Sequence, residues 1–199
     1  MRRILLTIAI LMGMAMPIAA SAQFSESYNF LKAVRERDGT ETMKFLNKQG
    51  GTIIDTHDSS NGDTALHIVT RDRDTTWLGF MLAKGAKVDT RNSKGETPLL
   101  IAAQLGYDEG VELLLNHGAS IDLANGNGET ALILATQNDN VPLVRLLLEN
   151  GANPDKTDHI SGTSARTYAQ RFTRDPTLAQ AFSETRAVHH HAAAQGPKL

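Results

Sequence analysis

Blocks of polar and apolar positions alternate along the chain, and they recur at a fixed distance. A polar step containing Gly and Thr precedes a short apolar run in NGDTALHIVT, in KGETPLLIAAQLG and in NGETALILAT. The glycines of these steps are Gly62, Gly95 and Gly128, which are 33 residues apart, and a degenerate fourth copy begins one residue late at Gly162. A fixed period of this length indicates a supersecondary unit stacked on copies of itself.

Each period predicts two short helices and a loop. The polar step supplies a hydroxyl that can accept a hydrogen bond from a free amide at the start of the first helix, at Thr64, Thr97, Thr130 and Ser164. Gly106 allows the turn into a second apolar run, DEGVELLLNHG. These second runs end at glycines that can close a helix in the left-handed conformation, namely Gly85, Gly118 and Gly151. The polar, turn-rich stretch that follows predicts a hairpin-like loop.

The paired helices carry more apolar residues than they can bury against each other, so the units must stack. The residues of the second copy resemble the ankyrin repeat, namely Gly95-x-Thr97-Pro98-Leu99, Ala102-Ala103, Gly106, Leu113-Leu114-Leu115, Gly118-Ala119 and Asp122. This resemblance implies an all-α solenoid of stacked helix-turn-helix units with hairpin-like loops.

The expected domain is an ankyrin repeat domain over residues 23–186. It consists of a divergent first repeat at 25–58, repeats at 59–91, 92–124 and 125–158, and a C-terminal capping repeat at 159–186. In the last repeat Arg166 and Thr167 replace Leu99 and Leu100, and such polar substitutions suit a capping unit. Residues 187–199 lack a second apolar face and are expected to form a flexible tail.

The N-terminus predicts an export signal. The letters MRR are followed by an apolar stretch and by Ala20-Ser21-Ala22, which fits the small-x-small pattern of signal peptidase, so residues 1–22 are expected to be cleaved off. An uncleaved anchor is the alternative, but the apolar stretch is shorter than the roughly 20 residues that cross a bilayer. The Arg2-Arg3 pair loosely resembles a twin-arginine signal, although general secretion is favoured. We expect a periplasmic or secreted protein with no stable membrane insertion after cleavage.

Charge and cysteine content narrow the possible partners. The formal net charge of the 199 residues is −2, and loss of Arg2 and Arg3 with the signal peptide leaves −4. This balance gives no support to binding of nucleic acid or anionic lipid. The chain has no cysteine, so neither a disulfide nor a thiolate metal site can stabilise it.

Two patterns superficially suggest ligand chemistry. Residues 126–131, GNGETA, match the dinucleotide pattern G-x-G-x-x-A, but they fall in phase with the repeat loops rather than after a buried strand. Metal donors stand close together at Asp55, His57 and Asp58 and again at His189-His190-His191, where adventitious binding is favoured over a true site. No local nucleophile signature is present. We therefore assign no catalytic, cofactor or metal residues and predict a non-enzymatic protein.

His67 and Trp77 could be taken for ligand-binding residues, but their positions in the repeat favour structural roles. His67 stands where the ankyrin motif carries a histidine that bonds to backbone near the preceding loop, and the next two copies replace it with Leu100 and Ile133. Trp77 falls at an outer-helix position that packs against a neighbouring unit. Both are expected to stabilise the fold rather than to bind a ligand.

The resemblance implies that the loops and first helices line a concave face that binds another protein. Transfer of the family's contact positions by phase selects Asn61, Asp63, Arg71, Asp72, Lys94, Glu96, Gln104, Leu105, Asn127, Glu129, Gln137 and Asn138. This set is mixed in charge and lacks aromatic residues, so it contains no hot-spot cluster of Trp, Tyr and Arg.

The sequence as a whole predicts a monomeric, exported interaction module that serves as an accessory or protective factor for another exported protein. Resemblance to exported bacterial ankyrin proteins suggests two kinds of partner, an oxidative-stress enzyme such as a catalase, or a toxin. The alternative is a small-molecule or metal-binding protein that uses the inner groove or the histidines, and an enzyme is the third possibility.

Overall fold

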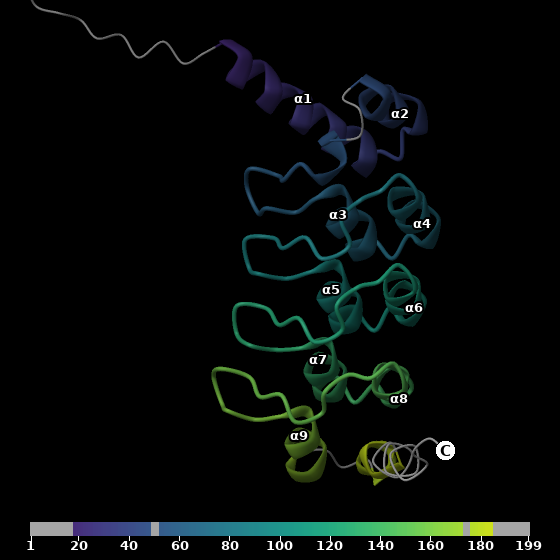
Figure 1. Ribbon diagram of the computed structural model, residues 1–199, viewed down its shortest axis with the longest axis vertical. Coiled ribbons are helices and arrows are strands. Elements are labelled where there is room, and N and C mark those ends of the chain that lie inside the picture. The colour runs from purple at the N-terminus through teal and green to yellow at the C-terminus, as the bar shows by residue number, and fades with distance from the viewer. Residues whose placement is uncertain (1–17, 49–51, 173–175, 185–199) are drawn as a thin grey trace, which may run out of the picture.

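The computed structural model describes residues 18–48, 52–172 and 176–184, with side chains from residue 26 onward. Its helices stack in one column (Figure 1). They are α1 (Ile18–Arg35), α2 (Gly39–Lys48), the 3-10 helix η1 (Thr52–Asp55), α3 (Ala65–Arg71), α4 (Thr75–Ala83), α5 (Pro98–Leu105), α6 (Asp108–Asn116), α7 (Ala131–Gln137), α8 (Val141–Glu149) and α9 (Ala165–Arg171), followed by a helix at 176–184.

Two rows of helices and one row of loops make up the column. The inner helices α1, α3, α5, α7 and α9 pack on one another, and α2, α4, α6 and α8 each pair with the inner helix before them (Figure 1). The loops before α3, α5, α7 and α9 project on the other side, and we call them fingers 1 to 4 (residues 56–63, 87–96, 120–129 and 153–163). The described residues contain isolated β-bridges between fingers 3 and 4 and the residues that begin α7 and α9, but no strand. The predicted all-α solenoid is confirmed.

The predicted hydroxyls begin the inner helices. Oγ1 of Thr97 accepts a hydrogen bond from the Leu100 amide at 3.4 Å, and Oγ1 of Thr130 accepts one from the Ile133 amide at 3.3 Å. Pro98 occupies the first turn of α5, where a missing N–H costs nothing.

The turns between paired helices do not all use glycine. Gly106 is left-handed with φ 60°, but the equivalent residues in other units are Arg37, Arg73 and Asp139, with φ of 58°, 54° and 52°. The Arg37 side chain bonds to Asp74 and Asp72 of the next turn at 2.7 and 2.8 Å. Burial alone would lower the Arg37 pKa, but these hydrogen bonds outweigh it and raise the pKa. At Arg37, contacts between units therefore help to stabilise a left-handed non-glycine residue.

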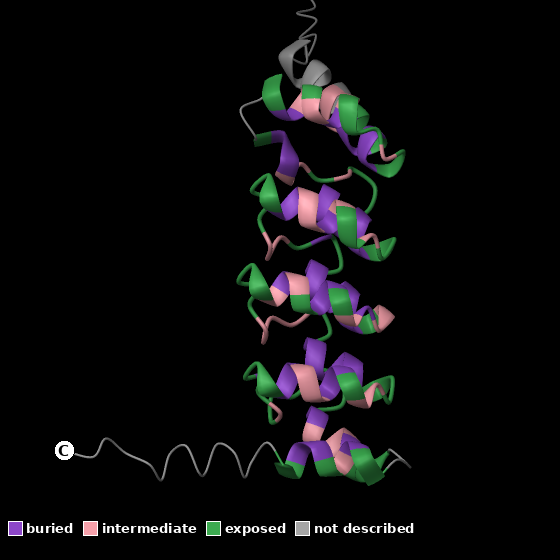
Figure 2. Cartoon of the chain, turned by 90° about the vertical axis from the view of Figure 1, so that its right-hand side faces the viewer, coloured by how far each residue is buried: buried purple, intermediate pink, exposed green. Residues whose placement is uncertain are grey.

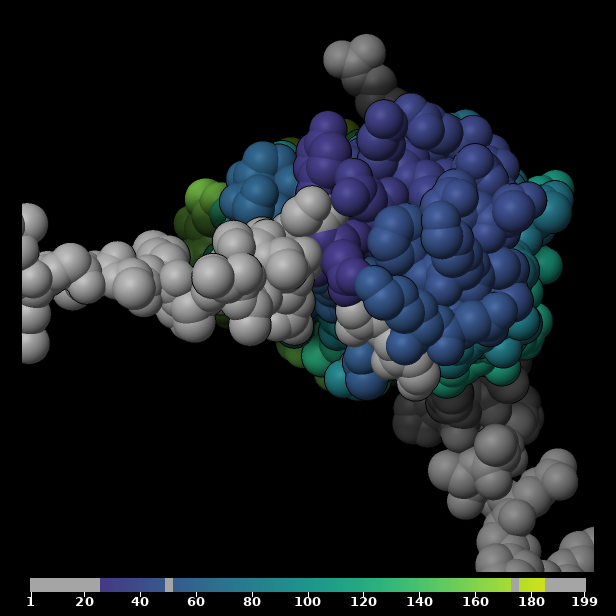
Figure 3. Space-filling view, turned by 90° about the horizontal axis from the view of Figure 1, so that it is seen from above, coloured from purple at the N-terminus to yellow at the C-terminus, as the bar shows by residue number. Residues whose placement is uncertain are grey.

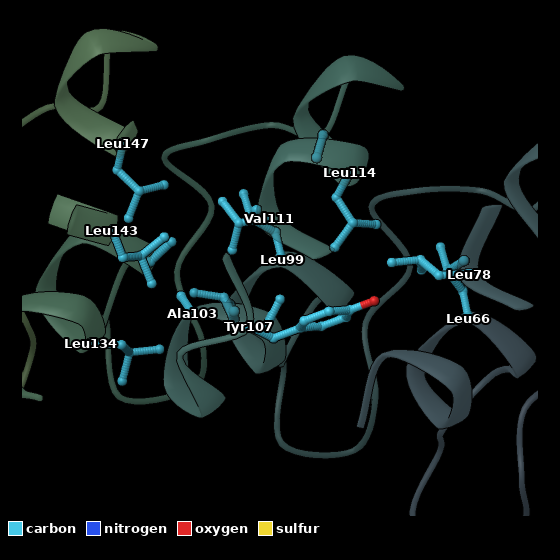
Figure 4. Close-up of a cluster of buried hydrophobic side chains, with 14 of the residues drawn as sticks. Leu66, Leu78, Leu99, Ala103, Tyr107, Val111, Leu114, Leu134, Leu143 and Leu147 are labelled. Carbon is cyan, nitrogen blue, oxygen red and sulfur yellow. The ribbon is translucent and has the colours of Figure 1, made fainter. Parts of the chain in front are cut away.

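The core runs without interruption through the column. Leu114 of α6 is fully buried beside Leu78 of the preceding unit, and Leu143 and Leu147 of the following unit are fully buried as well (Figure 4). Figure 2 looks onto the outer helices, along which buried, intermediate and exposed residues alternate. Trp77 is half-buried and packs against this core as predicted, with Arg37 lying over its ring at 5.5 Å.

Neighbouring fingers are joined by two repeating bonds. At the tips, the amides of Ser93, Gly126 and His159 donate to the carbonyls of Asn61, Lys94 and Asn127, at 3.0, 3.0 and 2.8 Å. At the bases, the carboxylates of Asp55, directly before finger 1, and of Asp89 and Asp122 accept from the amides of Lys87, Ser120 and Asn153, at 2.9, 3.0 and 2.9 Å. Each interface between fingers thus repeats the same backbone geometry.

The two ends of the column are covered differently. α1 is 18 residues long, whereas α3 and α5 have 7 and 8. Figure 3 looks onto this N-terminal end, where the first two helices spread over the column. At the other end, Leu178 and Phe182 of the final helix are buried.

Two expectations concern residues at the ends of the chain. Residues 1–17 of the expected signal peptide and the expected tail at 187–199 lie outside the described residues, while residues 18–22 form the beginning of α1. Within the described part of the chain, no helix combines the length and the apolar character that crossing a membrane requires.

The bonds between finger tips explain why glycine recurs every 33 residues, at Gly62, Gly95 and Gly128. A Cβ on Gly128, where φ is 81°, would lie 2.7 Å from the His159 backbone nitrogen. Gly118 has nearly the same φ, 83°, but has open space around it. Gly128→Ala should therefore lower the free energy of unfolding by about 2–4 kcal/mol, since steric overlap adds to the left-handed strain of about 1–2 kcal/mol.

Gly118→Ala is the matched control and should show the strain alone, and urea denaturation followed by circular dichroism measures both variants. Equal destabilisation by the two substitutions would contradict the assigned close approach of the fingers.

Candidate functional site: the concave face

The twelve expected contact residues form four columns because equivalent residues recur every 33 positions. Two columns lie on the fingers, namely Asn61/Lys94/Asn127 and Asp63/Glu96/Glu129, and a third, Arg71/Gln104/Gln137, lies at the C-terminal ends of the inner helices. The fourth, Asp72/Leu105/Asn138, lies on the turns between paired helices. We call the first three columns the concave strip.

The structure exposes most of these twelve residues but not all. Asn61, Arg71, Asp72, Lys94, Gln104, Asn127, Gln137 and Asn138 are exposed, and Leu105 and Glu129 are half-buried. Asp63 and Glu96 are only 3% and 9% exposed, so too little of their surface remains for direct contact with a partner. These two acids hold the fingers in position instead.

Asn92, which the sequence analysis missed, organises the buried acids. Its Nδ2 donates to Oδ1 of Asp63 at 2.9 Å and to Oε2 of Glu96 at 2.8 Å, and its Oδ1 accepts from the Lys94 and Glu96 amides at 3.0 Å. Asn125 has the same role toward Glu129 one unit later. The signal in the sequence is the recurrence of Asn three residues before Gly95 and Gly128.

Arg71 joins this network from α3. Its Nη2 lies 3.3 Å from Oδ2 of Asp63 and 3.7 Å from Oε2 of Glu96, so one guanidinium bridges acids of two consecutive units. Asp72 is held by Arg37, and Asn138 donates from its Nδ2 to the carbonyl of Gln104 at 2.9 Å. The fourth column therefore links successive turns.

His67 stabilises the fold as predicted, with a bond to the backbone directly after the preceding finger and a second bond to the following finger. The ring is fully buried, Nδ1 accepts from the Thr64 amide at 3.1 Å, and Nε2 lies 3.0 Å from the Glu96 carbonyl oxygen. A carbonyl can only accept, so Nε2 carries the proton and the ring is neutral. Burial lowers the His67 pKa, opposed by the bond to Glu96.

The residues considered for metal binding have other partners. Asp55 accepts from the Lys87 amide, His57 Nδ1 lies 2.8 Å from the Gly62 carbonyl, and Asp58 pairs with Arg35. The Ser60 hydroxyl and amide, together with Arg35, hold the Asp58 pKa at about 2. No group of three metal-ligating side chains is found among the described residues. His189 to His191 lie outside them.

Residues 126–131 form the turn of finger 3 and the start of α7, in a setting unlike the strand and helix of a dinucleotide site. A separate pocket of about 290 Å³ lies between α1 and finger 1, lined by Ser27, Tyr28, Leu31, His57, Asp58, Ser59 and Ser60.

A family comparison agrees with this architecture. The model of ankyrin repeats in three copies matches residues 30–125 and 77–158, which is more than half of the chain. The chain therefore belongs to the ankyrin repeat family. Ankyrin repeats are in general modules of protein–protein interaction, and the family is typically non-enzymatic.

The neutral, buried state of His67 predicts a pH dependence. The folded pKa lies below the ordinary 6.5, so the unfolded chain takes up a proton that the folded chain does not as the pH falls through 6.5. Stability from His67 is thus fully present above pH 6.5 and declines below it, until the folded pKa is reached, by up to about 1.4 kcal/mol per pH unit.

His67→Gln, which keeps a donor for the Glu96 carbonyl, should flatten this slope between pH 7 and 5.5, as measured by urea denaturation. A parallel pH profile for the parent and the variant would show that His67 does not contribute the dependence.

Proposed function

We propose that this chain is an exported, non-enzymatic protein that binds a protein partner through the concave strip. The observation that carries the proposal is the regular exposure of Lys94, Gln104, Asn127 and Gln137 on consecutive units whose backbones are fixed to one another. Side chains on a rigid scaffold lose less conformational freedom on binding than side chains on mobile loops. The strip is thus suited to recognition of a folded surface or an extended segment.

Export and role extend the proposal beyond the fold. The signal-peptide pattern at residues 1–22 supports secretion to the periplasm or beyond. In that compartment an accessory or protective factor would bind another exported protein, with an oxidative-stress enzyme and a toxin as the two candidate partners. The proposed binding unit is a monomer, because its concave strip is complete within one chain.

Small-molecule binding is kept as the second candidate because of the pocket between α1 and finger 1. A ligand held there would raise the melting temperature of the protein in proportion to the logarithm of its concentration. Substitution of Tyr28, which lines the pocket and is 64% exposed, by Ala would remove that shift without disturbing the core.

Export can be tested directly. Expression of the full chain in its source cells, followed by fractionation and intact-mass measurement, should place the protein in the periplasm or medium with Gln23 as its first residue. Ala20→Arg and Ala22→Arg should block processing, because signal peptidase requires small residues at both positions. An unprocessed chain in the cytoplasmic fraction would contradict the export proposal.

Partner binding is tested by affinity capture with the mature chain from the exported fraction of the source cells. Lys94→Ala, Gln104→Ala and Gln137→Ala in one chain should reduce retention of a specific protein by about 10-fold or more, since each truncation removes part of the contact energy. Glu112→Ala, Asn116→Ala and Glu149→Ala form the matched control on the outer helices, where the same number of exposed side chains is removed.

The control chain should retain the protein as the parent does, and both variants should keep the parent's melting temperature. Equal retention by the parent and the concave variant would overturn the assignment of the concave strip.

A further inference from the structure

In one repeat of the concave strip, the acids are paired with a cationic side chain of the same protein, that of Arg71. Its guanidinium, 3.3 Å from Asp63 and 3.7 Å from Glu96, lies between the acids of two consecutive units. Because the strip repeats every 33 residues, the next equivalent place lies between Glu96 and Glu129. There the residue equivalent to Arg71 is Gln104, which is exposed and carries no charge. The column of acids therefore continues to Glu129, but the repeat has no arginine equivalent to Arg71 that could pair with it.

Glu129 differs from Asp63 and Glu96 in what surrounds it. It is half-buried rather than buried, and Oε2 accepts from Nδ2 of Asn125 at 2.8 Å and from Nδ2 of Asn127 at 3.3 Å. Its other oxygen, Oε1, accepts no hydrogen bond from the described residues, and no lysine or arginine among them forms an ion pair with this carboxylate. Two amides orient the group without neutralising it.

We propose that the protein partner inserts an arginine side chain over Glu129, beside Gln104 and Gln137, in the place that Arg71 fills one repeat earlier. This inference rests on the proposed binding of a protein by the concave strip and specifies the chemistry of that partner. Arginine is favoured over lysine because its planar guanidinium can donate to a carboxylate and to neighbouring amide oxygens at the same time. Gln104 and Gln137 are exposed, and their side-chain amides each contain such an acceptor.

Lys94 is the other cationic residue of the concave strip, and it does not pair with Glu129. Lys94 is exposed on finger 2 and forms no ion pair among the described residues, so it sets a limit on the partner rather than filling the site. A partner with a basic side chain over Glu129 and an acidic or neutral group near Lys94 would match the strip, whereas a uniformly basic surface would be repelled at finger 2.

The test uses N-acetyl-arginine amide as a probe of the site, with N-acetyl-citrulline amide as its neutral isostere. Titration into the ¹⁵N-labelled chain from Gln23 onward, at low salt, should give saturable shifts at Glu129, Gln104 and Gln137 with the arginine probe only. Glu129→Gln should weaken the arginine response at least 3-fold. Gln104→Arg, which supplies the missing cation from within the chain, should weaken it equally. Glu112→Gln on the outer face should leave it unchanged.

Melting curves of the three variants establish that each is folded. The proposal is overturned if the arginine and citrulline probes give the same response, or if Glu129→Gln responds as the parent does.

A second arm separates this inference from the proposed function. In the capture experiment, Glu129→Gln and Gln104→Arg should each lose the partner that the parent retains. Retention of the partner by both variants would show that the concave strip binds a protein without an arginine over Glu129. If the parent retains nothing, the proposed function fails, and the probe titration still decides whether the guanidinium site exists.

Discussion

The close approach of neighbouring units is the constraint on which the rest of the structure depends. The helix pairs share one core, because Leu78, Leu114 and Leu147 of successive units are fully buried in a cluster that runs through the stack. The approach must also be close at the fingers, where a Cβ on Gly62 would lie 2.7 Å from the Ser93 nitrogen. Hydrophobic stacking supplies the driving force, and glycine at the finger tips permits the backbone contact that sets the spacing.

The sequence predicted the fold well because this constraint is periodic. The recurrence of Gly, Thr and Leu at one spacing identifies the stack and the helix starts, since each repeated residue meets the same requirement in every unit. The turns between helices were less predictable. Arg37, Arg73 and Asp139 adopt a conformation typical of glycine, and what supports Arg37 there, a pair of aspartates in the next unit, is visible only in three dimensions.

The concave site stays a prediction, but the sequence did not show which of its residues are buried, for a related physical reason. The position of a residue within the repeat identifies its equivalents in other units. It does not show which of these side chains form bonds between units. Asp63 and Glu96 share phase with Glu129, yet they are buried because Asn92 and Arg71 bond to both of them. The recurrence of Asn92 and Asn125 is visible in the sequence, but an Asn in a polar loop is common, and the bonds that Asn92 makes to two acids are visible only in three dimensions.

The difference in burial among Asp63, Glu96 and Glu129 explains how equivalent acids can serve either stability or recognition. A buried carboxylate needs compensation within the fold, since an unpaired charge there would cost several kcal/mol. Where a cation of the chain pairs with the carboxylate, as Arg71 does, that carboxylate is not available to bind a partner. Where the chain supplies only amides, as around Glu129, solvent completes the compensation, and a partner can replace solvent without disturbing the stack. Recognition in this protein is therefore expected at the positions where the repeat departs from its own pattern, because a strict repetition of Arg71 would have neutralised the strip from within.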